Sequence, residues 1–171
     1  GATSAYLLNE SLPEFNLKLQ YAAKNDARKT ETVAGLGADV MKISPRIVTA
    51  AGYETEESLT GLAAMGFFKQ RWPKWTWKAE AVWGQNLHHL TMLGGYAVRG
   101  VLDAARLDWS YTPIATLSLW TEIMTNGTAW QTGLFAGYAR NLGSPHEITG
   151  TSYGRGTDIG ELYRLSPRLV Y

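Results

Sequence analysis

The stretch from Phe67 to Trp83 constrains the fold of this 171-residue chain more than any other. It reads FFKQRWPKWTWKAEAVW, and Pro73-Lys74 marks a tight turn between two candidate strands. Successive side chains of a strand point to opposite faces. The second strand therefore has one charged face and one apolar face with aromatic ends, and the apolar face carries Trp75, Trp77, Ala79, Ala81 and Trp83.

The aromatic residues at the ends of that apolar face have a spacing typical of a membrane-spanning strand. Trp75 and Trp83 are eight residues apart, which is about 26 Å along a strand. A strand tilt of about 40° shortens this to roughly 20 Å, close to the ~25 Å apolar band that aromatic girdles flank in outer-membrane barrels. The spacing and parity recur from Trp130 to Tyr138 and from Tyr163 to Tyr171. We therefore predict an all-β fold, an antiparallel up-and-down transmembrane β-barrel, whose membrane girdles are Trp75, Trp77, Trp83, Trp130, Tyr138, Tyr163 and Tyr171.

The composition agrees with a β-rich envelope protein. Charged residues make up 18%, below the usual ~25%, while 18 glycines, 9 tyrosines and 7 tryptophans suit curved, closely packed strands. A net charge of +1 does not favour a nucleic-acid partner. The chain has no cysteine. It also has no run of about 20 apolar residues, so no transmembrane helix is expected. Because it begins at Gly1, we expect a processed or partial chain.

The lengths of the connections provide a second, independent signal. Seven candidate strands cover residues 14–22, 33–49, 59–72, 75–87, 108–125, 130–144 and 158–171. Long connections and tight turns alternate between them, as in an up-and-down membrane barrel. Residues 1–171 then form a single barrel region, as part or most of the wall. An eighth strand over Ala2–Asn9 would allow a small closed barrel with a filled interior; otherwise the chain belongs to a wider barrel.

The connection over residues 88–108 is unusually long. Val98, Val101, Leu102 and Ala105 are spaced as on one face of a short helix. Three roles remain open for it: a constriction folded into the pore, a latch onto a neighbouring subunit, or an ordinary extracellular loop.

A cationic repeat indicates the lining of a lumen. MKISPRIV (41–48) and YRLSPRLV (163–170) share a Ser-Pro-Arg core, and the alternation assigns their basic residues to the face opposite the lipid. The predicted pore-lining residues are Lys18, Lys42, Arg46, Lys78, Glu80, Arg164 and Arg168. Two interpretations remain open, an anion-favouring constriction and a structural ion-pair network with acidic residues such as Glu80 or Glu122.

Several strings resemble a known family. GLFAGYARNLG (133–143), YGRGTDI (153–159) and RLSPRLV (164–170) are similar to the later part of the outer-membrane porins of Bacteroidetes. The resemblance runs from about Phe15 to Tyr171. It implies a β-barrel channel for small solutes, trimeric like other general porins, and a longer family chain with further strands on both sides. It carries over no catalytic residues.

Other functions have weaker support in the sequence. His88-His89 and His146 have no acidic partner at ligand spacing, so we expect no metal site, no cofactor and no catalytic residues. The expected function is passive diffusion of small polar or anionic solutes, including ions, across the outer membrane of a Gram-negative bacterium. The expected partners are the lipid bilayer, lipopolysaccharide, small solutes and further copies of the chain. A small non-conducting structural or adhesive barrel, an outer-membrane hydrolase and a soluble ligand-binding barrel are the alternatives.

Overall fold

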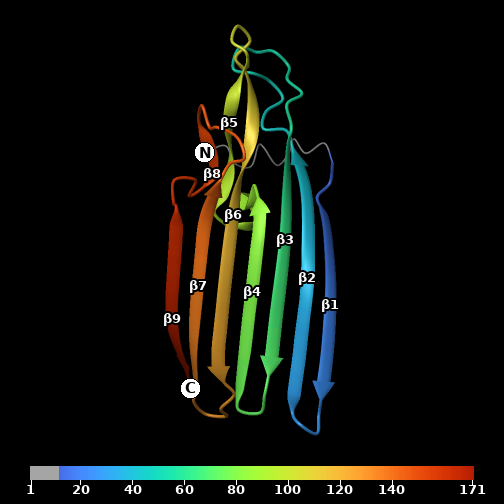
Figure 1. Cartoon of the computed structure of the whole chain (residues 1–171), viewed down its shortest axis with the longest axis vertical. Helices are drawn as coiled ribbons and strands as arrows, with labels where there is room; N and C mark the ends of the chain where they lie inside the picture. Colours follow the sequence, from blue (N-terminus) through green and yellow to red (C-terminus); the bar gives the residue numbers. More distant parts are fainter. Residues whose placement is uncertain (1–11) are drawn as a thin grey trace.

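Antiparallel strands account for most of the chain in the computed structural model, which describes residues 12–171. Seven long strands lie side by side in the order β1-β2-β3-β4-β6-β7-β9, which we call the wall (Figure 1). Its members are β1 (Phe15–Asn25), β2 (Thr30–Ile43), β3 (Leu59–Arg71), β4 (Trp75–Gln85), β6 (Asp108–Thr125), β7 (Gln131–Gly143) and β9 (Glu161–Val170). The all-β, antiparallel prediction is confirmed. The strand suggested over Ala2–Asn9 lies outside the described residues.

The wall is an open sheet and does not close into a barrel. β1 and β9 are its two edges, and each pairs with a single neighbour, β2 and β7 respectively. Because seven successive neighbours alternate in direction, the two edge strands run the same way. Direct pairing of β1 with β9 would therefore be parallel, unlike every other pair in the wall.

All the tight turns lie at one end of the wall and all the long connections at the other (Figure 1). The lower end holds residues 26–29, 72–74 and 126–130, and the upper end holds residues 44–58, 86–107 and 144–160. The predicted alternation is confirmed. The first connection was expected to span the polar residues 23–32, but β1 and β2 extend into that stretch and leave only four residues between them.

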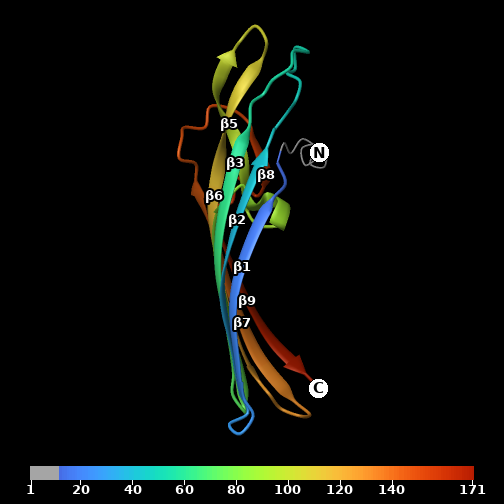
Figure 2. The same ribbon diagram turned by 90° about the vertical axis from the view of Figure 1, so that its right-hand side faces the viewer.

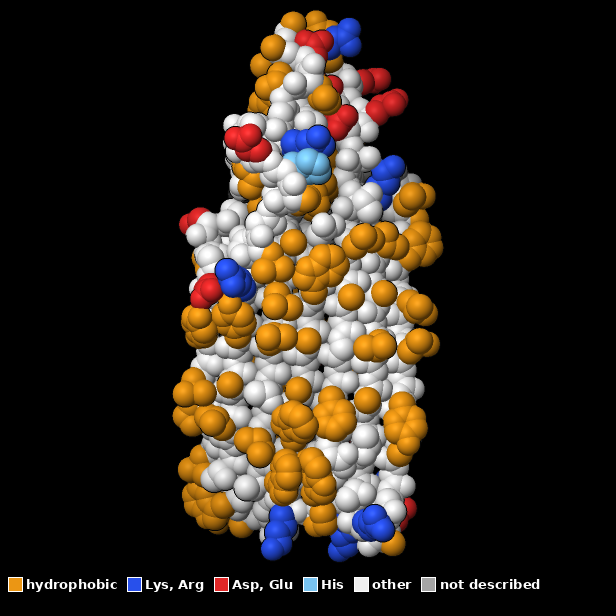
Figure 3. Space-filling view, in the orientation of Figure 1, with side chains coloured by type: hydrophobic (Ala, Val, Ile, Leu, Met, Phe, Trp, Pro, Cys, Tyr) orange, Lys and Arg blue, Asp and Glu red, His pale blue; other side chains and the backbone are white. Residues whose placement is uncertain are grey.

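Strand alternation gives the wall two different faces. The register places Leu19, Leu36, Ala81 and Leu119 in one row of an apolar face that continues to Tyr163. The opposite, polar face contains most of the charged residues of the wall, which include Lys18, Lys69, Lys78, Glu80, Glu122, Arg164 and Arg168. Figure 3 shows the apolar face, where charged side chains gather toward the two ends.

A smaller unit, the upper lobe, covers the upper end of the polar face. It contains η1 (Leu87–Leu90), β5 (Gly94–Asp103), β8 (Ser152–Arg155) and the upper half of β6. Seen edge-on, the wall bends, and η1 lies on its concave side (Figure 2). His89 of η1 approaches Asp39, which belongs to the polar face. The polar face is therefore the concave one.

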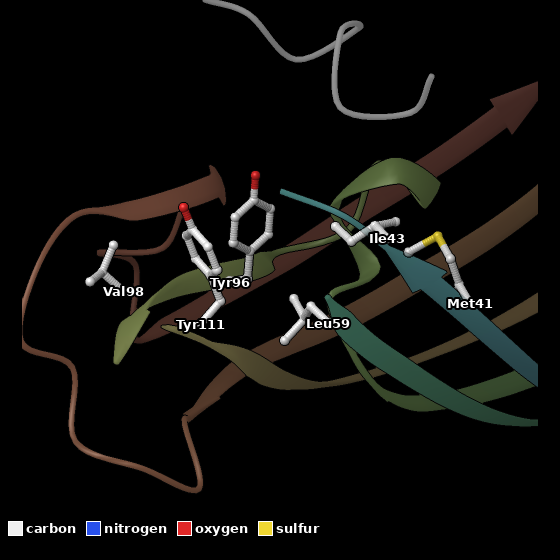
Figure 4. Close-up of a cluster of buried hydrophobic side chains, with 6 residues drawn as sticks. All are labelled: Met41, Ile43, Leu59, Tyr96, Val98 and Tyr111. Carbon is white, nitrogen blue, oxygen red and sulfur yellow. The ribbon is translucent and has the colours of Figure 1, made fainter. Parts of the chain in front are cut away.

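The main buried core lies between the wall and the upper lobe (Figure 4). Met41, Ile43 and Leu59 come from the polar-face side of β2 and β3. They pack with Tyr96, Val98 and Tyr111 of the upper lobe, and these six side chains are each at most 9% exposed. Apolar residues thus point inward at this end because the lobe shields them from water.

The segment 88–108 is not an irregular loop with a helix. It contains β5, which pairs with β6 over Gly95–Asp103 and with β8 over Gly94–Ala97. The helical spacing of Val98, Val101 and Leu102 was misleading because the upper half of β6 offers a free edge that recruits this segment as a strand. The described helix is η1, a single 3₁₀ turn.

Candidate functional site

The concave, polar face is the candidate functional surface, and an ion-pair network lies on it toward the lower end of the wall, near the tight turns. Lys78 of β4 and Glu122 of β6 are register partners, with 2.9 Å between Nζ and Oε2. Arg168 of β9 reaches the other oxygen of the same carboxylate, Oε1, at 3.3 Å. The Glu122 side chain is 12% exposed, so this partly buried carboxylate is shared by two cations.

Two further cations of this face lie over aromatic rings. The Lys18 ammonium is 4.8 Å from the centre of the Phe67 ring, and the Arg164 guanidinium is 5.5 Å from the centre of the Phe135 ring. A cation over a ring face is attracted by the ring's quadrupole. Within residues 12–171 neither cation has a carboxylate within 4.0 Å. Their positive charge is therefore not neutralised by an ion pair in this region.

Glycines make room for these rings. Phe67 lies directly across from Gly35 of the neighbouring strand, and a Cβ atom at Gly35 would collide with its ring. A Cβ at Gly137 would lie 3.0 Å from the Phe135 ring. The rings can therefore lie flat along the polar face, where they support Lys18 and Arg164.

The acidic side chains of the face are also engaged. Trp120 donates its indole N–H to Glu80 at 3.1 Å, and its ring stacks on Phe135 with centroids 5.8 Å apart. Glu80, Trp120 and Arg164 belong to one register row that crosses the wall. The interpretations of a structural network and of a cationic surface therefore both describe parts of this face.

Two residues predicted for this face lie elsewhere. Lys42 has the parity of Leu36 and Val40 and so belongs to the apolar face, at its upper end. Arg46 lies beyond the end of β2, where its Nε donates to the Tyr111 hydroxyl at 2.6 Å and its guanidinium stacks over Trp109 at 4.1 Å. The prediction failed because Met41 and Ile43, which look like lipid-facing positions, are buried under the upper lobe.

The predicted girdle residues within strands share the apolar face. They are Trp75, Trp77, Trp83, Tyr138 and Tyr163. Trp130 and Tyr171 lie just outside β7 and β9 and contact each other with ring centroids 4.6 Å apart. Between the aromatic residues, small side chains such as Ala79 and Ala136 leave a shallow hollow lined mostly by apolar-face residues.

A polar cluster beside η1 was missed at the sequence level. His89 lies next to Glu14, just before β1, and Asp39 of β2. Burial favours protonation of Glu14, but bonds with Asp39 and Asn16 and the nearby His89 together hold its pKa below the usual range. Burial, and then the charges of His89 and Arg155, lower the pKa of His88. No local spacing could have indicated the cluster, because its members come from three separate segments.

Comparison with known proteins identifies no relative, since the chain matches no protein-family model, no curated protein and no solved structure. Across residues 12–171, no helix has the length and apolarity needed to span a membrane.

Proposed function

We propose that the chain forms part of the wall of an outer-membrane β-barrel pore through which small polar or anionic solutes diffuse passively. The observation that carries the proposal is the pair of opposite faces on the same seven strands. Leu19, Leu36 and Leu165 are 64%, 67% and 70% exposed on the apolar face. Such a surface is unfavourable in water and suits the hydrocarbon core of a bilayer.

The polar face supports the assignment of a water-filled interior. At the midplane of a bilayer, an Arg or Lys on the lipid side costs ~2–4 kcal/mol, whereas a lumen tolerates charge. Lys78, Arg164 and Arg168 all lie on the face opposite the leucines. The polar face is also the concave one (Figure 2), as the inside of a barrel must be.

The expected selectivity follows from the distribution of charge. Glu122 is shared by Lys78 and Arg168, while Lys18 and Arg164 lie over rings. Positive charge thus exceeds negative charge around this network, so anions would be concentrated in the pore. The mechanism is diffusion, with no energy source or cofactor. The resemblance to Bacteroidetes porins is the ground for proposing a trimer, which native mass spectrometry of the extracted protein would test.

Single-channel conductance in planar bilayers, with reversal potentials under a salt gradient, tests the proposal. We expect stable open steps with anion preference, and a reduced preference in Arg164→Gln and Arg168→Gln. Lys74→Gln removes the same charge from the turn between β3 and β4 and is the matched control, which should behave like the parent protein.

Two results would contradict the proposal in different ways. Unchanged anion preference in both arginine variants would show that the polar face does not line the conducting path. A correctly folded, heat-modifiable protein that gives no conductance would exclude a pore and favour a structural or adhesive barrel.

A further inference from the structure

Three side chains from separate parts of the chain meet on the concave side of the wall, next to the upper lobe. Glu14 directly precedes β1, Asp39 lies in β2, and His89 lies in η1. Each offers one possible ligand atom, and these atoms all lie within 4.8 Å of one another. His89 Nε2 lies 3.5 Å from Glu14 Oε1.

The imidazole of His89 is oriented as a metal ligand would be. Its Nδ1 lies 3.1 Å from the main-chain oxygen of Asn86. A carbonyl can only accept a hydrogen bond, so Nδ1 carries the proton and, in the neutral ring, Nε2 keeps its lone pair. Metal-bound histidines commonly use this arrangement, because the second N–H bonded to a carbonyl fixes both the tautomer and the ring orientation.

The lone-pair nitrogen of His89 is buried and has no hydrogen-bond partner. The side chain is only 9% exposed, and Nε2 is inaccessible to solvent and unsatisfied among the described residues. A polar atom left in this state costs free energy, and this one faces two carboxylates. The lone pair of His89 Nε2 and the oxygens of the two carboxylates all favour contact with a positive charge, so a cation between them would explain this arrangement.

The carboxylates point to the same conclusion. Asp39 Oδ2 is also buried and has no hydrogen-bond partner in the described part of the chain. Two neighbouring carboxylates repel each other unless a proton or a cation lies between them. The Glu14 side chain remains 28% exposed and provides an entry path for an ion.

We propose that Glu14, Asp39 and His89 bind one divalent cation of the Zn²⁺ type. Zn²⁺ accepts imidazole nitrogen and carboxylate oxygen ligands and commonly combines three protein ligands with one open position. The bound ion would cross-link the start of β1, the upper part of β2 and η1. It would thereby fasten an edge strand of the wall to the upper lobe, whether or not the wall conducts solutes.

Calorimetric titration of the chelator-treated, folded protein in detergent with ZnCl₂ tests this inference. We expect one Zn²⁺ per chain, and at least about tenfold weaker binding in His89→Gln and in Asp39→Asn, since even outer-shell changes cost 10- to 100-fold. The matched control is His88→Gln. His88 is adjacent in sequence, but its Nδ1 lies 3.0 Å from the Asn86 side-chain oxygen, and the residue is not part of the cluster.

A second measurement keeps the inference testable if a variant folds poorly. Saturating Zn²⁺ should raise the melting temperature of the parent protein and of His88→Gln, because a ligand that binds only the folded state stabilises it. The absence of binding to the folded parent protein would overturn the site and leave a protonated His89–Glu14 ion pair as the explanation. Equal binding by folded Asp39→Asn and His89→Gln would also overturn it.

Discussion

At the scale of single residues, Asn126 shows how one side chain can join two neighbouring turns by hydrogen bonds. Its amide donates to the carbonyl of Trp72 at 2.7 Å, and its Oδ1 accepts from the Thr76 hydroxyl at 2.8 Å. Its main-chain N–H donates to the carbonyl of Lys74 at 2.8 Å. Asn126 therefore ties the turn after β6 to the turn between β3 and β4.

Replacing Asn126 by alanine should destabilise the protein by about 2 kcal/mol, because two side-chain hydrogen bonds are lost and the buried Thr76 hydroxyl loses its acceptor. Urea unfolding in detergent would measure the difference. Thr128→Ala, an exposed change in the same turn, should have little effect. A loss of stability as large in Thr128→Ala would show that the turn tolerates no truncation and that the amide has no special role.

The face of the wall on which a side chain lies could be predicted from the sequence where the whole face has the same surroundings. Trp75, Trp77 and Trp83 share a face as the alternation required. It failed for Lys42, because the sequence does not reveal that the upper lobe buries its neighbours Met41 and Ile43. Alternation identifies two faces but not what covers each of them.

At the scale of elements, the pairing of β5 with β8 depends on glycines. Gly95 and Gly154 are opposite each other in the ladder, with φ of +146° and +144°. A Cβ at Gly154 would collide with the main chain of Gly94. The strings GGY and YGR, which fit no phosphate-binding loop, are therefore the two halves of one close strand contact.

Gly154→Ala should separate β8 from β5 and leave the wall intact. We expect proteolysis within residues 144–160 to become at least several-fold faster, while heat-modifiability is retained. Limited proteolysis of the folded protein would show this. Gly160→Ala is the control, since a Cβ there meets nothing within 4 Å; cleavage accelerated equally in both variants would contradict the role assigned to the contact.

Strands could be predicted from the sequence where a turn-forming dipeptide separates them. Pro73-Lys74 and Asn126-Gly127 each lie in a tight connection, as expected. β5 and β8 were missed because their pairing depends on the free upper edge of β6, which exists only after the wall has formed. The polar cluster of Glu14, Asp39 and His89 was missed because only the tertiary fold brings its three segments together.

At the scale of the whole molecule, the wall has two open edges, β1 and β9, whose outer main-chain groups have no neighbouring strand in the described part of the chain. Unpaired main-chain groups at the edges of a sheet are not tolerated in hydrocarbon. β1 and β9 run in the same direction, so an antiparallel cylinder needs an odd number of further strands between them. The proposed barrel therefore requires strands in addition to the seven of the wall.

Disulfide trapping would test this requirement, and the absence of native cysteine makes it simple. The double variant Leu19→Cys with Leu165→Cys, on the two edge strands, should form no bond within one chain. The control pair is Ala136→Cys with Leu165→Cys, which are register partners between β7 and β9. An intramolecular bond between positions 19 and 165, seen as a gel shift without reductant, would show that the edges meet directly.

The 18-residue length of β6 has a mechanical consequence. Its lower half is bonded to β4 and β7, and its upper half to β5. A pulling force applied to the upper lobe along this strand would load both lower ladders in shear, with many hydrogen bonds resisting together instead of opening one at a time. Because β6 belongs to both units, tension on the upper lobe would be transmitted through β6 to the neighbouring strands β4 and β7.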